Sequence, residues 1–557
     1  MRTFVRSIMT GVAVASLALP LSAQAAEQDL QQKLDNLTKE VEALKHQTKK
    51  IEDKSIGRWL TISGDYMFRY DYLNGKSPSY YPFMPGFTAP SGTTPAGASA
   101  YVGVGNPTLP GYGYTVVQTA PAQNGGANYL VNPYGSVPES RVKNDALYTH
   151  RFGLNLNAKP VENITIAARL LMYKAWGNQT DSVLQSGTTS YSFDRAGLFD
   201  GTIGHLPSSS LLDVDRVYID WENIADEPIW FSIGRRPSTD GVPTHLKNND
   251  KRPGVGGIPA LLVNYAFDGL TLGYAPDIDA LPGAYGKFCY GRGFSTGLAD
   301  SRNASNSLKD TDMFGVQVSP YNTDALSILL QYNRGVNIFD APQMLSGAFA
   351  QILNGPKTNV GDIDWYGVNF LGEVKHVGPG TLNWFVQGAM DVTHPNGNTL
   401  KLYNPYDPTG GSYIETNQGL LWSGTPNSTN GWAAFAGVRY DFLPTLTKIG
   451  FEYNHGSKNW MAFSPAEDDM WTTKVGTRGD VYEGYLIQEL HLKPISSYFS
   501  KAFFRVGYQY YNFDYTGSNS WLGAPVDLDA LNSPMSAQMT APLKNAQDLY
   551  ATFELKF

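Results

Sequence analysis

The chain contains 557 residues with a formal net charge of −8, and this acidic balance argues against nucleic acid as a partner. The mean hydropathy is −0.28, and no window approaches the roughly 18 unbroken apolar residues of a membrane helix. A single cysteine, Cys289, excludes an internal disulfide, a CxxCH haem attachment and a cysteine-based metal cluster. We therefore predict neither a cofactor nor a metal. The 34 Tyr, 11 Trp and 57 Gly form instead a weak joint signature of a transmembrane β-barrel.

Residues 1–25 have the pattern of a signal peptide. Arg2 and Arg6 form a basic start, residues 8–21 form an apolar stretch, and residues 23–25 (Ala-Gln-Ala) supply small side chains before a cleavage site. The apolar stretch is short for a stable anchor, although an uncleaved membrane helix is the alternative. We predict export across the inner membrane, with Ala26 as the first mature residue.

Residues 26–55 are predicted to form a short periplasmic coiled-coil helix. Residues 27–53 include no Gly or Pro, and their apolar positions recur at the a and d spacing of a heptad. The alternative is a lone amphipathic helix packed on its own barrel. We expect the helix to join protomers, and analogy suggests a homotrimer. The predicted oligomerisation residues are Leu30, Leu34, Leu37, Val41, Leu44 and Ile51.

After the heptads the hydrophobic period becomes two, which marks the start of a predicted barrel over residues 56–557. Tyr66 and Phe68 share one face of the first strand, whereas Asp65 and Arg69 share the other. The alternating run is longer than the usual strand of about five or six residues and suits a tilted membrane-spanning strand. In lipid every backbone amide must be paired, so such strands have to close on themselves.

The same alternation recurs to the end of the chain and predicts an all-β fold, a transmembrane antiparallel β-barrel of about 16 strands. Short turns, one of them at Asp268-Gly269, alternate with long loops, as in outer-membrane barrels. The last segment ends in Phe557 and resembles the C-terminal insertion signal of such barrels, so we expect outer-membrane lipids around the wall. The predicted strands are 58–73, 146–159, 163–176, 211–222, 228–236, 259–267, 270–276, 311–319, 324–333, 363–375, 380–391, 431–442, 446–455, 481–493, 500–514 and 545–557.

A barrel of about 16 strands is too wide for side chains to fill, so a water-filled lumen is predicted. Strand parity places charged side chains inside, with a mainly basic wall facing a more acidic one and a field between them. The alternative is that these charges pair with their neighbours. Parity also leaves His150 and Gln488 on the lipid face, and Leu329 and Leu371 inside. The predicted pore-lining residues are Arg69, Arg151, Arg169, Arg216, Glu373, Asp391, Glu452, Glu489 and Arg505, together with Arg439 and Lys448.

The third long connection, residues 238–257, is a candidate constriction loop. Wide barrels usually narrow their pore with an infolded loop, and this one is rich in Gly and Pro. An ordinary external loop is the alternative reading. Its candidate charged residues are Lys247, Asp250, Lys251 and Arg252.

An enzyme is not expected. Residues 293–297 match the GxSxG pattern of hydrolases, but that motif works on a strand-to-helix elbow followed by an acid and a histidine. Here it falls in a predicted loop between membrane strands. Cys289, also in a predicted loop, is read as a single unreactive thiol.

Three features together resemble a poorly characterised family of porin-like outer-membrane proteins from anaerobic sulfate- and metal-reducing bacteria. They are residues 213–221 (DVDRVYIDW), residues 232–243 (SIGRRPSTDGVP), and the heptads that lead directly into a first strand. The overall plan also looks like that of trimeric phosphate- and sugar-selective porins. The resemblance implies a porin for passive diffusion of small hydrophilic solutes or ions. The alternative that it implies is a barrel that sheathes a multihaem cytochrome for extracellular electron transfer.

Overall fold

The computed structural model describes residues 59–81, 137–179, 181–186, 189–192, 205–236, 238–254, 259–298, 308–340, 356–407, 412–492, 501–533 and 536–557. The chain divides into two compact units, Met1–Thr61 and Ile62–Phe557. The predicted signal peptide and the coiled-coil residues Leu30, Leu34, Leu37, Val41, Leu44 and Ile51 lie outside the described residues. Among the described residues, no helix is long and apolar enough to cross a membrane.

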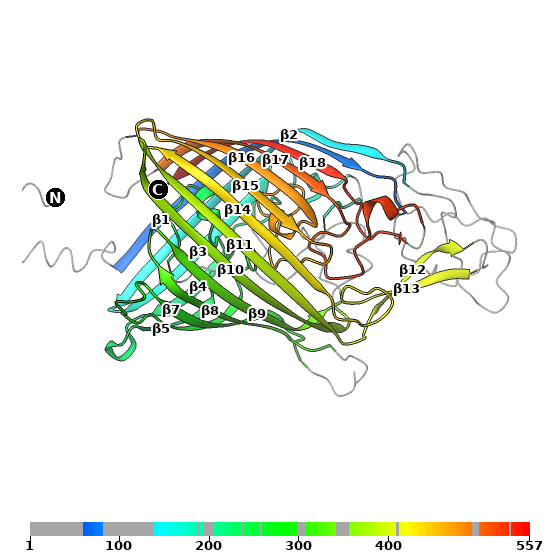
Figure 1. Cartoon of the computed structure of the whole chain (residues 1–557), viewed down its shortest axis with the longest axis horizontal. Coiled ribbons are helices and arrows are strands. Elements are labelled where there is room, and N and C mark those ends of the chain that lie inside the picture. Colours follow the sequence, from blue (N-terminus) through cyan, green and yellow to red (C-terminus); the bar gives the residue numbers. More distant parts are fainter. Residues whose placement is uncertain are drawn as a thin grey trace, which may run out of the picture. The chain divides into compact units, whose positions relative to one another are not determined.

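Sixteen antiparallel strands close into one barrel, which confirms the predicted fold class (Figure 1). Each strand pairs with its neighbour in the chain, apart from a separate hairpin of β12 (Leu400–Asp407) and β13 (Ser412–Gln418) between β11 and β14. The barrel strands are β1 (Leu60–Ser77), β2 (Ser140–Val161), β3 (Ile164–Ala175), β4 (Asp213–Trp221), β5 (Ile229–Arg235), β6 (Asp268–Tyr274), β7 (Tyr285–Phe294), β8 (Thr311–Asn322), β9 (Ser327–Phe339), β10 (Asn359–Val377), β11 (Gly380–Pro395), β14 (Asn430–Phe442), β15 (Thr447–Gly456), β16 (Gly479–Glu489), β17 (Lys501–Phe513) and β18 (Asn545–Lys556).

Short helical segments lie in the described connections between strands. One four-residue α-helix, α3 (Thr244–Lys247), lies between β5 and β6. The short 3₁₀ segments are η1 (Asp181–Leu184), η2 (Ile224–Asp226), η4 (Lys474–Gly476) and η5 (Leu528–Ala530).

The first and last strands close the barrel. β1 pairs with β18 from Asp65 opposite Lys556 to Lys76 opposite Asn545. Next to the Asp65–Lys556 end of this ladder, the backbones of Gly64 and Phe557 exchange two hydrogen bonds, of 2.7 and 2.9 Å. The terminal residue therefore helps to remove the open edge that lipid would not tolerate.

The wall alternates between an apolar outer face and a buried inner face. On β1, Tyr66 is partly exposed outside, whereas Met67, Arg69 and Asp71 are buried inside. His150 does lie on the outer face, where its Nδ1 accepts a 2.6 Å hydrogen bond from the indole of Trp176. The neighbouring Trp176 thus supplies a hydrogen-bond donor to the polar imidazole on this apolar face.

A repeated polar triad marks the outer face near the loop ends of three strand pairs. In each, an aspartate on one strand accepts from a tyrosine hydroxyl and from a cationic or imidazole side chain two residues further along the neighbouring strand. Along each strand the tyrosine comes first and the charged or imidazole side chain follows it towards the loop. This order is expected where a strand passes from lipid into water. The triads are Tyr290, Arg292 and Asp312; Tyr332, Arg334 and Asp364; and Tyr453, His455 and Asp480.

The predicted strand count is right although two predicted elements are wrong. Residues 259–267 do not form a strand, β7 at Tyr285–Phe294 was missed, and Asp268-Gly269 lies inside β6 instead of in a turn. Cys289 accordingly lies in β7, and the GxSxG motif begins at the end of that strand. Residues 259–267 are apolar because they pack inside the barrel, and hydrophobic periodicity does not separate such a segment from a wall strand.

Candidate functional site

Residues 242–250, between β5 and β6, lie inside the barrel. Their backbone carbonyls and side chains contact side chains of β11, β14, β15, β16, β17 and β18. For example, the Val242 carbonyl accepts from Gln387, and the Asn248 carbonyl accepts from Lys556. A segment that enters from β5 reaches so many strands of the opposite wall only by crossing the interior. The short helix α3 is therefore part of an infolded loop.

A cluster of charged side chains surrounds the ring of Tyr550, on β18. The cationic groups of Arg69, Lys247 and Arg505 lie 4.3, 5.4 and 5.9 Å from the ring centroid. The Tyr550 hydroxyl donates a 2.7 Å hydrogen bond to Glu483. Three cations on one buried ring are favourable only because carboxylates neutralise them. The cluster thus joins β1, β16, β17, β18 and the infolded loop.

Carboxylates of the wall hold the cations of this cluster in place. Arg69 is fully buried between Asp71 at 2.6 Å and Asp548 at 3.0 Å. Arg505 pairs with Glu554 at 2.6 Å, and Lys247 with Glu483 at 2.7 Å. Each cation of the cluster has a carboxylate partner, so the cluster is not uniformly basic.

A second infolded loop, residues 457–478 between β15 and β16, contributes Lys474. The ammonium of Lys474 pairs with Glu452 on β15 and, at 2.6 Å, with Glu483 on β16. Burial lowers its pKa, but the two carboxylates outweigh burial and hold the pKa above its usual range. The side chain therefore stays charged.

A polar cavity of about 60 Å³ lies between the two infolded loops and the wall. Arg151, Lys247, Glu452, Asp468 and Lys474 are among its lining residues. A cavity holds a water when it offers about 10–15 Å³ and polar partners, so this space suits several waters or a hydrated small ion.

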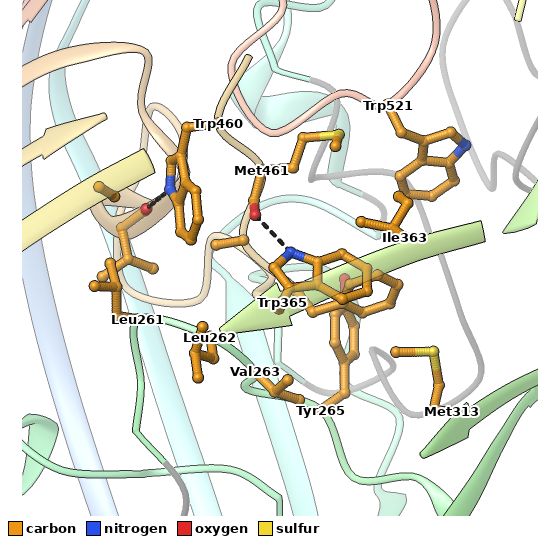
Figure 2. Packing of buried hydrophobic residues seen from close by; sticks show 14 of the residues in the cluster. Leu261, Leu262, Val263, Tyr265, Met313, Ile363, Trp365, Trp460, Met461 and Trp521 are labelled. Carbon is orange, nitrogen blue, oxygen red and sulfur yellow. Dashed lines mark hydrogen bonds between the residues drawn. The ribbon is translucent and has the colours of Figure 1, made fainter. Parts of the chain in front are cut away.

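Apolar side chains of the two loops pack against the inner wall (Figure 2). The Trp365 indole on β10 is fully buried, donates a 2.9 Å hydrogen bond to the Met461 carbonyl and packs edge-on against Phe463 at 4.8 Å. Leu329 and Leu371, which parity placed inside, belong to the same core. They point inward because the infolded loops give them an apolar surface to pack on.

His205, in the loop between β3 and β4, ties that loop to the second infolded loop. Its Nε2 lies 2.5 Å from Asp215, and its Nδ1 lies 3.0 Å from Glu467. Burial lowers the pKa of His205, but Asp215 and Glu467 outweigh burial and raise it to about 10. The imidazole is therefore a cationic clamp at neutral pH. Within the described ranges, no group of three or more His, Cys, Asp or Glu side chains is placed to hold a metal ion.

A family model described as a protein of unknown function (DUF3373) matches residues 141–557, well over half of the chain. The chain belongs to the DUF3373 family. The curated proteins provide no match.

Solved structures similar to this DUF3373 protein include three outer-membrane proteins or porins. "OmpT (in-vitro folded), an outer membrane protein Vibrio cholerae (trimer form)" is 11% identical with a TM-score of 0.35, covering 90% of this chain and 100% of that one. An anion-selective porin from Comamonas acidovorans is 10% identical with a TM-score of 0.36, covering 89% and 99%. The outer membrane channel DcaP of Acinetobacter baumannii is 10% identical with a TM-score of 0.34, covering 89% and 96%.

The four arginines predicted for a basic wall each have carboxylate partners nearby. Besides Arg69, Arg151 pairs with Asp468, Arg169 with Asp65 and Asp215, and Arg216 with Asp215 and Asp240. These aspartates lie next to the arginines, so the structure does not separate a basic wall from an acidic one. The parity argument omitted these aspartates. Pairing with neighbours, the alternative reading, describes the observed contacts.

The remaining candidates are scattered over the inner face. Asp391 is buried beside Gly431, whereas Glu373 pairs with Lys375. Glu489 and Lys448 pair at 2.8 Å near Asn249. Arg439 pairs with Asp441 and donates to the Leu246 carbonyl.

The candidates in the infolded loop have different environments. Lys247 reaches the central cluster, and Asp250 pairs with Lys556 at 2.6 Å. Arg252 donates to the turn between β8 and β9, at the Thr323 carbonyl and Asn322. Lys251 is exposed.

Sequence reasoning missed several members of the cluster. Asp548 and Tyr550 follow the inward parity of β18, so the same rule that selected Arg69 could have found Asp548. Lys474 and Asp468 lie in a loop, where parity gives no information. Only the fold of residues 457–478 into the barrel brings them to the site.

Proposed function

We propose that the chain is an outer-membrane porin with a narrow, ion-lined passage for passive diffusion of small hydrophilic solutes or ions. The observation that carries the proposal is the polar cavity between the two infolded loops, lined by Arg151, Lys247, Glu452, Asp468 and Lys474. Charged side chains that face a lumen filter solutes by size and charge. The closed barrel with an apolar outer face supports placement in the outer membrane.

The infolded loops favour this function over a cytochrome sheath. A sheath needs a lumen open enough to admit a second protein. Here, residues 242–250 cross the interior and bind six strands, and an apolar core fills the space beside them. Removing this packing to admit a cytochrome would expose buried apolar surface to water, which is unfavourable.

Export and assembly complete the proposal. The signal peptide at residues 1–25 delivers the chain to the periplasm, and the heptads of residues 26–55 join three protomers. A source among anaerobic sulfate- or metal-reducing bacteria stays a prediction from the resemblance.

The testing experiment is single-channel recording of the purified, refolded full chain in a planar lipid bilayer. The porin hypothesis predicts small, stable conductance steps, and a trimer predicts closure through three sub-levels. Absence of any channel, or a single very large and unstable pore, would contradict self-sufficient diffusion. A matched recording after deletion of residues 27–53 separates pore formation from oligomerisation, because only the grouping into three should change.

A further inference from the structure

A second pocket, of about 480 Å³, lies on the loop side of the barrel, apart from the ionic cluster. Besides Arg478, three segments form it: the end of β13 with the residues that follow it, the start of the loop between β17 and β18, and residues 536–540 of the same loop. Its volume falls within the range of roughly 300–1,000 Å³ that is usual for small-molecule sites.

The lining mixes polar and apolar side chains and carries little charge. Among the described residues, no aspartate or glutamate lines the pocket, although the chain as a whole is acidic. Its one charged residue, Arg478, is buried, and its guanidinium donates to the carbonyls of Trp460, Thr516, Gly517 and Ser520. Arg478 therefore holds the pocket floor together and has little capacity left for an anionic ligand.

Uncommitted polar groups and one aromatic ring lie around this floor. Trp422 is partly exposed, and within the described part of the chain its indole N–H donates no hydrogen bond. The side chains of Gln418 and Thr540 also line the pocket and make no hydrogen bond to another described residue. An aromatic face combined with amide and hydroxyl groups matches a ligand that has apolar C–H faces and many hydroxyls.

Two backbone segments of the pocket wall, at Gln418 and at Gly523, lie close together. Gly523 has a φ of +74°, and a Cβ at this position would lie 2.0 Å from the Gln418 Oε1. Glycine therefore allows the Gln418 amide to reach the edge of the pocket. The backbone of Gly523 also donates to the Gly419 carbonyl at 3.0 Å, which joins the two loops that face each other.

We propose that this pocket binds a soluble neutral saccharide, with a sugar ring stacked on Trp422 and its hydroxyls bonded to Gln418 and Thr540. The inference deepens the proposed function, because a saccharide held at the loop side would be a solute on its way to the passage. Its transport role rests on the proposed function, whereas the binding itself does not.

The test is calorimetric titration of the full-length barrel in detergent. The probes are maltotriose and cellotriose, and trigalacturonate serves as a charged trisaccharide of matched length. We expect a neutral trisaccharide to bind in the millimolar range, and trigalacturonate to bind at least tenfold more weakly. Trp422→Ala should weaken binding of the neutral probe by about tenfold, or about 1.4 kcal/mol. Ser423→Trp, which fills the pocket mouth, should abolish binding.

Trp432→Ala is the matched control, because Trp432 is half-exposed on the outer wall and should not contact the ligand. The inference is overturned if neither neutral trisaccharide binds, if trigalacturonate binds as tightly, or if Trp422→Ala and Ser423→Trp bind like the wild type. Single-channel recordings of the same variants separate the two proposals. A conducting barrel without saccharide binding refutes the pocket alone, and binding without conductance refutes the porin alone.

Discussion

The packing of Trp365 against the second infolded loop gives a prediction that tests how the passage is kept narrow. Trp365→Ala removes a fully buried indole, its hydrogen bond to the Met461 carbonyl and its contact with Phe463. Substitutions of this kind cost about 3–5 kcal/mol. That cost corresponds to a shift of roughly 100- to 4,000-fold in the equilibrium between the packed and the released loop. The barrel wall stays closed because its strand ladders do not depend on the indole.

Two assays measure how often the loop of residues 457–478 is released from its packed position. Limited proteolysis of the folded barrel should cleave within residues 457–478 much faster in Trp365→Ala than in the wild type, and single-channel current should become larger and noisier. Tyr366→Ala is the matched control, because the adjacent residue lies on the opposite, outer face and is 43% exposed. If Trp365→Ala and Tyr366→Ala are cleaved equally slowly and conduct like the wild type, the loop does not depend on this packing and the reasoning is refuted.

Three further predictions concern charge, pH and assembly. Lys474→Met leaves two carboxylates without their shared cation, so the reversal potential in a salt gradient should shift towards cation selectivity; an unchanged potential would place the passage elsewhere. The raised pKa of His205, about 10, means that its stabilisation is complete below the unfolded pKa of about 6.5, declines as pH rises and is lost above about 10. Thermal melts from pH 6 to 11 should show this decline in the wild type but not in His205→Gln, and parallel curves would contradict it. Gly269→Ala would place a Cβ 1.9 Å from the Tyr290 carbonyl oxygen, so the folded fraction on semi-native gels should fall sharply. Gly286→Ala is the control and should fold normally, because the nearest atom to its Cβ would lie 3.8 Å away. Equal folding of the two variants would show that β6 can shift.

The wall was predictable where its two faces differ in chemistry. On β1, outward aromatic residues alternate with Arg69 and Asp71, so the period of two is plain. On β7 the contrast is lost, because Gly286 and Phe288 face outward while Tyr285 and Lys287 face inward. Residues 259–267 show the reverse error, because a core inside the lumen demands the same apolar residues as a membrane face.

The candidate site was predictable only in part, for a geometric reason. Strand parity states which side of the wall a residue occupies, and Arg69 and Arg505 were found in this way. Asp548 and Tyr550 have the same inward parity on β18, but parity does not state that they lie beside Arg69 and Arg505. Loop residues such as Lys474 reach the cluster through long-range folding, which leaves no periodic trace in the sequence.

The contacts of the infolded loop also set an order of assembly. Residues 242–250 come early in the chain, yet their partners follow much later: Gln387 lies 145 residues after Val242, and Lys556 lies 308 residues after Asn248. Contacts this distant in sequence form slowly, because a long loop must close before any of them is made. The contacts of this loop with β17 and β18 can form only after those last strands are in place. We therefore expect a chain truncated before its final strand to lack both the closure of β18 onto β1 and the hold of Lys556 on the infolded loop.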